Sequence, residues 1–133
     1  MSEGDHGIDV LLAAWREGLA TGDLERVAGL VTQEAEFWSH GQPPLRGRQA
    51  VKEAFEPFLS QYKMDQEFRR EELIVVEDWA FMRGMEVNRL VPRDGEGETI
   101  VRQRAFSVMH RDGDGVWRFH RGMTNQPPEE ERS

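Results

Sequence analysis

The chain changes its hydrophobic period near its midpoint, and this change limits the folds that it can adopt. In the first half, apolar residues recur at spacings of three and four, which predicts amphipathic helices. In the second half, β-branched and aromatic residues form runs between turn residues, a pattern typical of strands. Because helices precede strands instead of alternating with them, the sequence predicts an α+β fold.

Three helices are expected in the first half. The first follows an apolar stripe over residues 8–19, and the second begins after Gly22 with Asp23 as its N-cap. A short strand is expected at residues 34–38, and the third helix at residues 50–59. These helices supply one apolar face each, which must be buried against another layer.

Four long strands are expected in the second half, at residues 65–76, 79–92, 98–111 and 115–125. Short connections between consecutive strands indicate an antiparallel meander. Strands of this length coil, so we expect a strongly curved sheet. Three helices packed on its concave side would leave a cone with an internal pocket.

The 133 residues are enough for one hydrophobic core, so one domain is expected over residues 1–126. The segment 127–133 begins with two prolines and is rich in glutamate, which predicts a disordered acidic tail. The N-terminus lacks the basic segment and apolar run of a secretory signal. We therefore expect a cytoplasmic protein.

Charge and composition disfavour several kinds of partner. The formal net charge is -8, whereas binding to nucleic acid relies on clustered Lys and Arg. No run approaches the roughly 20 apolar residues of a membrane-spanning helix. The chain has no cysteine, hence no disulfide and no thiolate metal ligand, and its histidines show no metal-binding spacing. We expect no nucleic-acid partner, no membrane partner, no metal and no cofactor.

Several motifs occur in the order found in one known superfamily. They are Trp15 followed by Gly22 and Asp23, then Phe37 and Trp38 before the segment 43–48, and finally the segment 114–119. With them the chain resembles the nuclear transport factor 2-like superfamily, in its SnoaL-like and ketosteroid-isomerase-like branch. The resemblance covers about residues 8 to 125.

This resemblance implies a cystatin-like α+β cone with a small-molecule pocket, and a homodimer formed through the outer face of the sheet. Members of the superfamily include isomerases, cyclases, dehydratases, epoxide hydrolases and binding or association domains. A fold shared by so many activities does not choose among them.

The catalytic set of ketosteroid isomerase is not retained in kind. Aligned through the Gly22-Asp23 corner, its tyrosine falls on Trp15, its base on or beside Ser39 and His40, and its protonated acid near Phe106. An imidazole can accept a proton at neutral pH, so His40 is the candidate base. The alternative is that His40 is a polar loop residue at the pocket rim.

The period of two along the strands predicts a second set of site residues. Trp79 and Arg83 share one side of their strand, as do Arg104 and Phe106 of the next. If these sides face inward, arginines enter an aromatic pocket and would clamp an anionic or carbonyl oxygen. The candidate ligand-binding residues are Trp15, Trp38, Trp79, Arg83, Arg104, Phe106, Arg121, Met123 and Asn125. The opposite orientation places the arginines on the exposed or dimer-facing side, because one β-bulge reverses every later assignment.

Three functions remain open at this point. The first is a protein that binds a weakly anionic or carbonyl-bearing metabolite without transforming it. The second is a cofactor-free isomerase, cyclase or dehydratase in which His40 acts as the base. The third is a dimerisation or association domain without a ligand.

Overall fold

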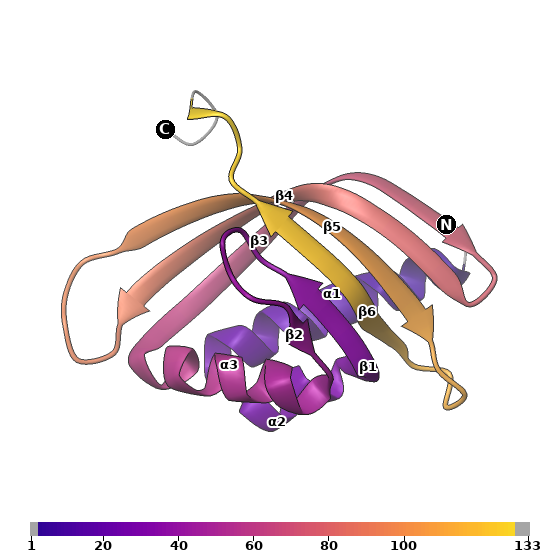
Figure 1. Cartoon of the computed structure of the whole chain (residues 1–133), viewed down its shortest axis with the longest axis horizontal. Coiled ribbons are helices and arrows are strands. Elements are labelled where there is room, and N and C mark those ends of the chain that lie inside the picture. The colour runs from indigo at the N-terminus through magenta and orange to yellow at the C-terminus, as the bar shows by residue number, and fades with distance from the viewer. Residues whose placement is uncertain (1–2, 130–133) are drawn as a thin grey trace.

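The computed structural model describes residues 3–129 of the chain. Three helices lie on one side of a single curved sheet, and the long strands arch over them (Figure 1). The α+β class and the order of helices before long strands are confirmed. The helices are α1 (Glu3–Thr21), α2 (Leu24–Gly29) and α3 (Arg48–Gln61).

The sheet has six strands in the order β2-β1-β6-β5-β4-β3. The strands are β1 (Val31–Trp38), β2 (Leu45–Arg46), β3 (Tyr62–Val76), β4 (Trp79–Pro92), β5 (Thr99–Arg111) and β6 (Trp117–Asn125). The long strands β3 to β6 form the expected antiparallel meander. The sheet is nevertheless mixed, because β1 pairs with β6 in parallel, and the two-residue strand β2 was not expected.

Local signals set the corner between α1 and α2. Gly22 has a φ of 71°, a conformation that glycine adopts without strain. Asp23 caps α2, since the backbone N–H of Arg26 donates to its Oδ1 at 3.2 Å. The short strand expected at residues 34–38 is β1, and it begins earlier than expected, at Val31.

The core lies between α1 and the concave face of the sheet. Ile8 and Leu11 of α1 are buried against Met82, Met109 and other sheet residues. The fit is close at Gly7, where a Cβ atom would lie 2.3 Å from Cδ1 of Trp117. Any larger residue would push α1 away from the sheet.

Two irregularities in pairing bend the sheet and decide which side chains face inward. The register between β3 and β4 shifts between Arg70 and Glu72. On β6, His120 is an extra residue between Phe119, paired with Met109, and Arg121, paired with Val108. Such a bulge bends its strand and reverses the side-chain alternation beyond it.

Strand β3 is the free edge of the sheet next to β4. Its side chains include many charges, and several form ion pairs with neighbouring groups. Arg16 of α1 donates to Asp65, Arg69 pairs with Glu67, and Arg70 pairs with Asp9. The edge is therefore lined by charged groups over most of its length.

No helix within residues 3–129 is both long enough and apolar enough to cross a membrane. The expected cytoplasmic location stays a prediction. Pro127, the first residue of the expected tail, is buried. Residues 130–133 of that tail lie outside the described residues.

The packing of α1 against the sheet can be tested by two substitutions in this helix. Ile8 is 0% exposed and Val10 is 55% exposed. We expect Ile8→Ala to lower the free energy of unfolding by about 2–5 kcal/mol, because it leaves a cavity in the core. Val10→Ala should change it by less than about 0.5 kcal/mol. Urea denaturation followed by circular dichroism measures both, and equal effects would contradict the described orientation of α1.

Candidate functional site

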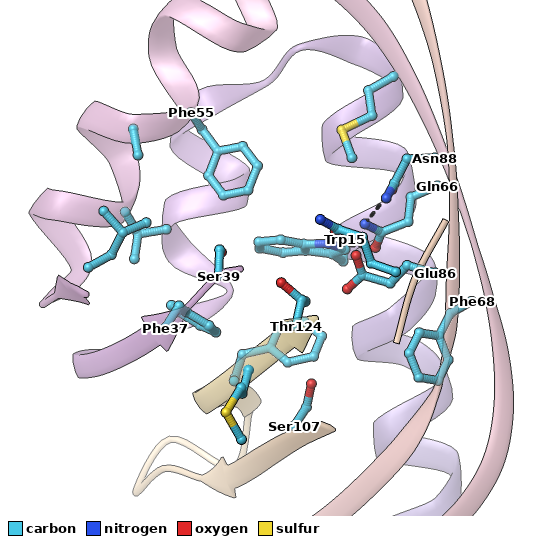
Figure 2. Close-up of a pocket in the computed structure, with 18 of the residues that line it drawn as sticks. Trp15, Phe37, Ser39, Phe55, Gln66, Phe68, Glu86, Asn88, Ser107 and Thr124 are labelled. Carbon is cyan, nitrogen blue, oxygen red and sulfur yellow. Dashed lines mark hydrogen bonds between the residues drawn. The ribbon is translucent and has the colours of Figure 1, made fainter. Parts of the chain in front are cut away.

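A cavity of about 630 Å³ lies between the helices and the concave face of the sheet. α1 contributes Leu12 and Trp15, and the facing wall comes from α3. Strands β3, β4, β5 and β6 contribute the rest, together with the end of β1, the loop after it and Leu45 of β2. Figure 2 shows 18 of the lining residues around the central space.

The walls are largely apolar and aromatic. The indole of Trp15 makes edge-on contacts with Phe55 of α3 at 5.7 Å and with Phe119 of β6 at 5.1 Å between ring centroids. Phe37, Phe58 and further apolar side chains complete the lining. Edge-on aromatic pairs are favourable and hold large rings in defined positions. These contacts therefore fix the position of the Trp15 ring in the wall of the cavity.

Glu86 of β4 is the only ionisable residue among the described residues that line the cavity. Its carboxyl group points into the cavity in Figure 2. Burial raises the pKa of Glu86 to about 7, and a hydrogen bond with the Asn88 side chain acts in the opposite direction. Near neutral pH this group can therefore hold or release a proton.

Two hydrogen bonds connect α1 with Asn88, the neighbour of Glu86 on the inner side of β4. The indole Nε1 of Trp15 donates to Oε1 of Gln66 at 3.1 Å, and Nε2 of Gln66 donates to Oδ1 of Asn88 at 2.8 Å. Asn88 lies two residues after Glu86 on the same side of β4, and it lowers the pKa of Glu86. Figure 2 shows these four side chains along one side of the cavity.

Five further polar side chains reach the cavity. Ser39 and Gln42 lie in the loop after β1, Gln103 and Ser107 lie on β5, and Thr124 lies on β6. Oγ1 of Thr124 is buried and has no hydrogen-bond partner. A buried hydroxyl without a hydrogen bond costs free energy, and a hydrogen bond to a ligand oxygen would recover it.

Three of the residues predicted to bind a ligand line this cavity, namely Trp15, Trp38 and Met123. Trp38 is half exposed at the end of β1, and its indole N–H donates to Oε2 of Glu36 at 2.7 Å. Met123 is also exposed on its other side. These residues come from α1, β1 and β6 and meet only in the folded chain.

The predicted inward arginines require a correction. Arg83 is exposed and donates to Glu71 and Glu72 of β3, and Arg104 is exposed and donates to Asn125. Together with Phe106, both arginines and Asn125 line a separate hollow of about 400 Å³. They lie on the outer face because Met82 and Glu86 take the inner positions of β4.

Arg121 is also directed away from the cavity. Its guanidinium donates to the backbone oxygens of Glu34 and His120. The physical reason is the bulge at His120, since Phe119 is buried and the inner side then passes to Gly122 and Thr124. An unbroken alternation from Phe119 would have placed Arg121 inside.

His40 and Trp79 do not line the cavity either. His40 is exposed in the loop after β1 and is not among the cavity residues, although its neighbour Ser39 is. Trp79 lies half exposed on the outer face, with ring centroids 4.4 Å from His110 and 5.4 Å from His120. The structure thus gives the candidate base no contact with the pocket.

Glu86 is not among the predicted site residues, because the bulky aromatic side of β4 is the one that its sequence favours as the inner side. The sequence did contain a signal for it. Glu86 and Asn88 are two residues apart, on the same side as Ala80 and Met82, so two polar groups stand on an otherwise apolar strand face. A single acid in such a position is a candidate for a perturbed pKa.

Within residues 3–129, no group of three or more His, Asp or Glu side chains is arranged to hold a metal ion. The ionisable chemistry of the cavity therefore rests on Glu86 among these residues.

Solved structures of other proteins share this architecture over nearly the whole chain. A conserved protein from Planctomyces limnophilus is 22% identical with a TM-score of 0.83, and the match covers 92% of this chain and 96% of that one. A ketosteroid isomerase-like protein from Erwinia carotovora is 18% identical with a TM-score of 0.78, covering 93% and 96%. An NTF2-like protein with a cystatin-like fold from Novosphingobium aromaticivorans is 18% identical with a TM-score of 0.77, covering 94% and 82%.

These identities are low, so the likeness shows the fold and leaves the chemistry open. The expected cystatin-like fold is confirmed by it. No curated protein matches the chain. The SnoaL-like domain family matches residues 12–120, which include the part of α1 that lines the cavity, all of α3 and the strand that carries Glu86. The chain therefore belongs to the SnoaL-like domain family.

Proposed function

We propose that this protein binds a small, mostly apolar metabolite with a carbonyl or hydroxyl oxygen, and that Glu86 exchanges a proton with it. The reaction class would be that of a cofactor-free isomerase, cyclase or dehydratase. One observation carries the proposal: a single carboxyl group with a pKa of about 7 points into an apolar cavity.

The size and lining of the cavity support a ligand. Pockets for small molecules usually measure about 300–1,000 Å³ and combine apolar walls with a few polar groups. The cavity of about 630 Å³ falls in this range. Its polar groups apart from Glu86 are neutral, and Thr124 is placed to bond a ligand oxygen.

Of the two ligand classes expected from the sequence, weakly anionic and carbonyl-bearing, the electrostatics favour the neutral carbonyl-bearing one. An anionic ligand would need cationic side chains, and none of the described cavity residues is an arginine or lysine. It would also be repelled by ionised Glu86. A ketone, an enol or an alcohol needs no cationic side chain and is not repelled by ionised Glu86.

The state of Glu86 suits proton transfer. Catalytic acids and bases work best when their pKa lies near the working pH, and one such group contributes roughly 10²–10⁴-fold to a rate. As a base, Glu86 would take a proton from the carbon beside a carbonyl. The electron pair of the broken C–H bond would move to the carbonyl oxygen and form an enolate. Return of the proton to a different atom would complete an isomerisation.

A proton-exchange experiment tests this function without knowledge of the natural ligand. The probe is 2-tetralone, a neutral aromatic ketone, incubated in D₂O and followed by ¹H NMR. We expect the protein to speed exchange of the protons beside the carbonyl, and Glu86→Gln to reduce this effect by about 10²-fold or more. Glu56→Gln, which removes an exposed carboxylate of α3, is the control.

Two results would count against the proposal. Equal exchange rates with the wild type and Glu86→Gln would remove Glu86 from the reaction. Absence of both exchange and thermal stabilisation by 2-tetralone, 2-naphthol and cyclohexenone would argue against a pocket for neutral oxygen-bearing ligands.

The same carboxyl group predicts how stability changes with pH. The folded protein raises the pKa of Glu86 from 4.5 to about 7, so the unfolded chain loses this proton first as pH rises. The contribution of Glu86 to the free energy of unfolding should therefore fall between about pH 4.5 and pH 7, by on the order of 3 kcal/mol. Urea denaturation of wild type and Glu86→Gln at pH 5.5, 6.5, 7.5 and 8.5 should show the variant gaining relative stability with pH. A constant difference would contradict the raised pKa.

We also propose that two copies pair through the outer face of the sheet. Large apolar side chains are exposed there on adjacent strands, where Ile74 of β3 pairs with Phe81 of β4, and Phe106 of β5 pairs with Met123 of β6. Contiguous exposed apolar side chains are typical of protein interfaces. Burying this face would leave the cavity on the opposite side open to its ligand.

Substitutions on this face test the pairing. Phe81→Glu should convert a dimer into a monomer, because a charge in the centre of an apolar interface is strongly unfavourable. Val10→Glu, an exposed apolar position on α1, is the matched control and should leave the dimer intact. Sedimentation velocity gives the mass of each variant. A wild type that sediments as a monomer at 100 μM would contradict the proposal.

A further inference from the structure

Gly122 of β6 faces the cavity because of the bulge at His120. In an unbroken alternation, Arg121 would take the inner position after Phe119, whereas the extra residue passes this position to Gly122. The parallel pairing of β1 with β6 places Phe37 opposite Gly122. Paired residues of neighbouring strands lie on the same face of the sheet, and Phe37 also lines the cavity. Gly122 and Phe37 are therefore direct neighbours in the cavity wall.

The ring of Phe37 lies directly against the backbone of Gly122. A Cβ atom at Gly122 would lie 2.6 Å from Cδ1 and 2.9 Å from Cε1 of Phe37, too close for either atom to stay in place. The next nearest atom, the backbone oxygen of Phe106, would be at 3.9 Å, an ordinary contact. Gly122 does not have a positive φ, so alanine can adopt its backbone conformation. One added methyl group would therefore displace the ring of Phe37 and little else.

A second glycine of the sheet differs from Gly122 in what lies next to it. At Gly84 of β4, a Cβ atom would lie 2.9 Å from the ring of Phe68, but it would also run into the backbone oxygen of Arg69. A substitution at Gly84 would therefore disturb the pairing of β3 with β4. At Gly122 only a side chain has to move, so the shape of the cavity can change there while the sheet stays paired.

Phe37 and Glu86 lie at opposite ends of the cavity. In the order of the sheet, β6 and β5 separate β1 from β4. Three strand spacings of about 4.8 Å, or roughly 14 Å along the sheet, therefore lie between the strands that carry Phe37 and Glu86. Figure 2 shows the two side chains on opposite sides of the central space. A ligand whose oxygen lies at Glu86 reaches Phe37 only if its skeleton extends beyond one ring.

We propose that Gly122 determines how long a ligand the cavity accepts, and that the ligand is a neutral ketone or alcohol built on at least two fused rings. The inference rests on the proposed function, which places the ligand oxygen at Glu86. Because Gly122 lets the Phe37 ring lie close to the sheet, the end of the cavity farthest from Glu86 stays open for the second ring. Phe37 also packs against the buried core, so a ring displaced from Gly122 moves into the cavity.

The experiment compares a two-ring and a one-ring probe on the whole protein. The probes are 2-naphthol and phenol, and the Kd of each is measured by NMR titration of the ¹⁵N-labelled protein. Gly122→Ala should weaken the binding of 2-naphthol by about tenfold or more, because the displaced Phe37 ring takes the space of the second ring. Phenol fits beside Glu86 alone, so its Kd should change by less than about threefold. Gly29→Ala is the matched control, since a Cβ atom at Gly29 would meet no neighbouring atom within 4 Å.

A second substitution separates the displaced ring from general damage to the fold. Phe37→Leu removes the ring, so adding it to Gly122→Ala should return the Kd of 2-naphthol to within about threefold of the wild-type value. On its own, Phe37→Leu should lengthen the cavity and improve the binding of the three-ring probe 9-phenanthrol relative to 2-naphthol. This single variant keeps Gly122, and it tests the same contact if Gly122→Ala does not fold.

The outcomes separate this inference from the proposed function. Selective loss of 2-naphthol in Gly122→Ala, with recovery in the double variant, supports the role of Gly122. Equal weakening of both probes, no weakening of either, or no recovery in the double variant overturns it, as does a wild type that does not bind 2-naphthol. If Gly122→Ala does not fold, an unchanged preference in Phe37→Leu overturns it. Because the measurement is binding, failure of proton exchange on 2-tetralone counts against the proposed function alone.

Discussion

The contact between α1 and the concave face of the sheet is the constraint on which the rest of the structure depends. Ile8 and Leu11 fill the core on this face, and Trp15 follows one turn later on the same side of the helix. Trp15 both contacts the core and lines the cavity. The packing that stabilises the fold therefore also places the indole beside Gln66. Stability and site geometry cannot be separated along this helix.

The spacing of apolar residues predicted most helices and strands, because helix and strand formation depends on local sequence patterns. The strand at residues 79–92 was predicted with the bounds that β4 has, and those of β3, β5 and β6 differ by a few residues. The parallel pairing of β1 with β6 joins segments about 85 residues apart, and no local pattern encodes such a contact. Strand β2 has only two residues, too few for any period to appear.

The site was harder to predict because it depends on which side of each strand faces inward. On β4, the side with Trp79 and Phe81 is bulkier, yet it is the exposed side. On β6, the bulge at His120 turns Arg121 outward. Trp15 was predicted to bind a ligand and does line the cavity, since a helix face is fixed by several residues at once. Its role as the donor that orients Gln66 appears only when β3 is folded against α1.

The long free edge of β3 shows how this fold avoids a common hazard. Unpaired backbone groups along an edge strand can join the edge of another molecule and start aggregation. Here the edge carries the ion pairs of Asp65, Glu67 and Arg70, which would have to be dehydrated before a second strand could approach. A protein concentrated in a cell can thus keep an open sheet, and the curvature that shapes its cavity, without closing the sheet into a barrel.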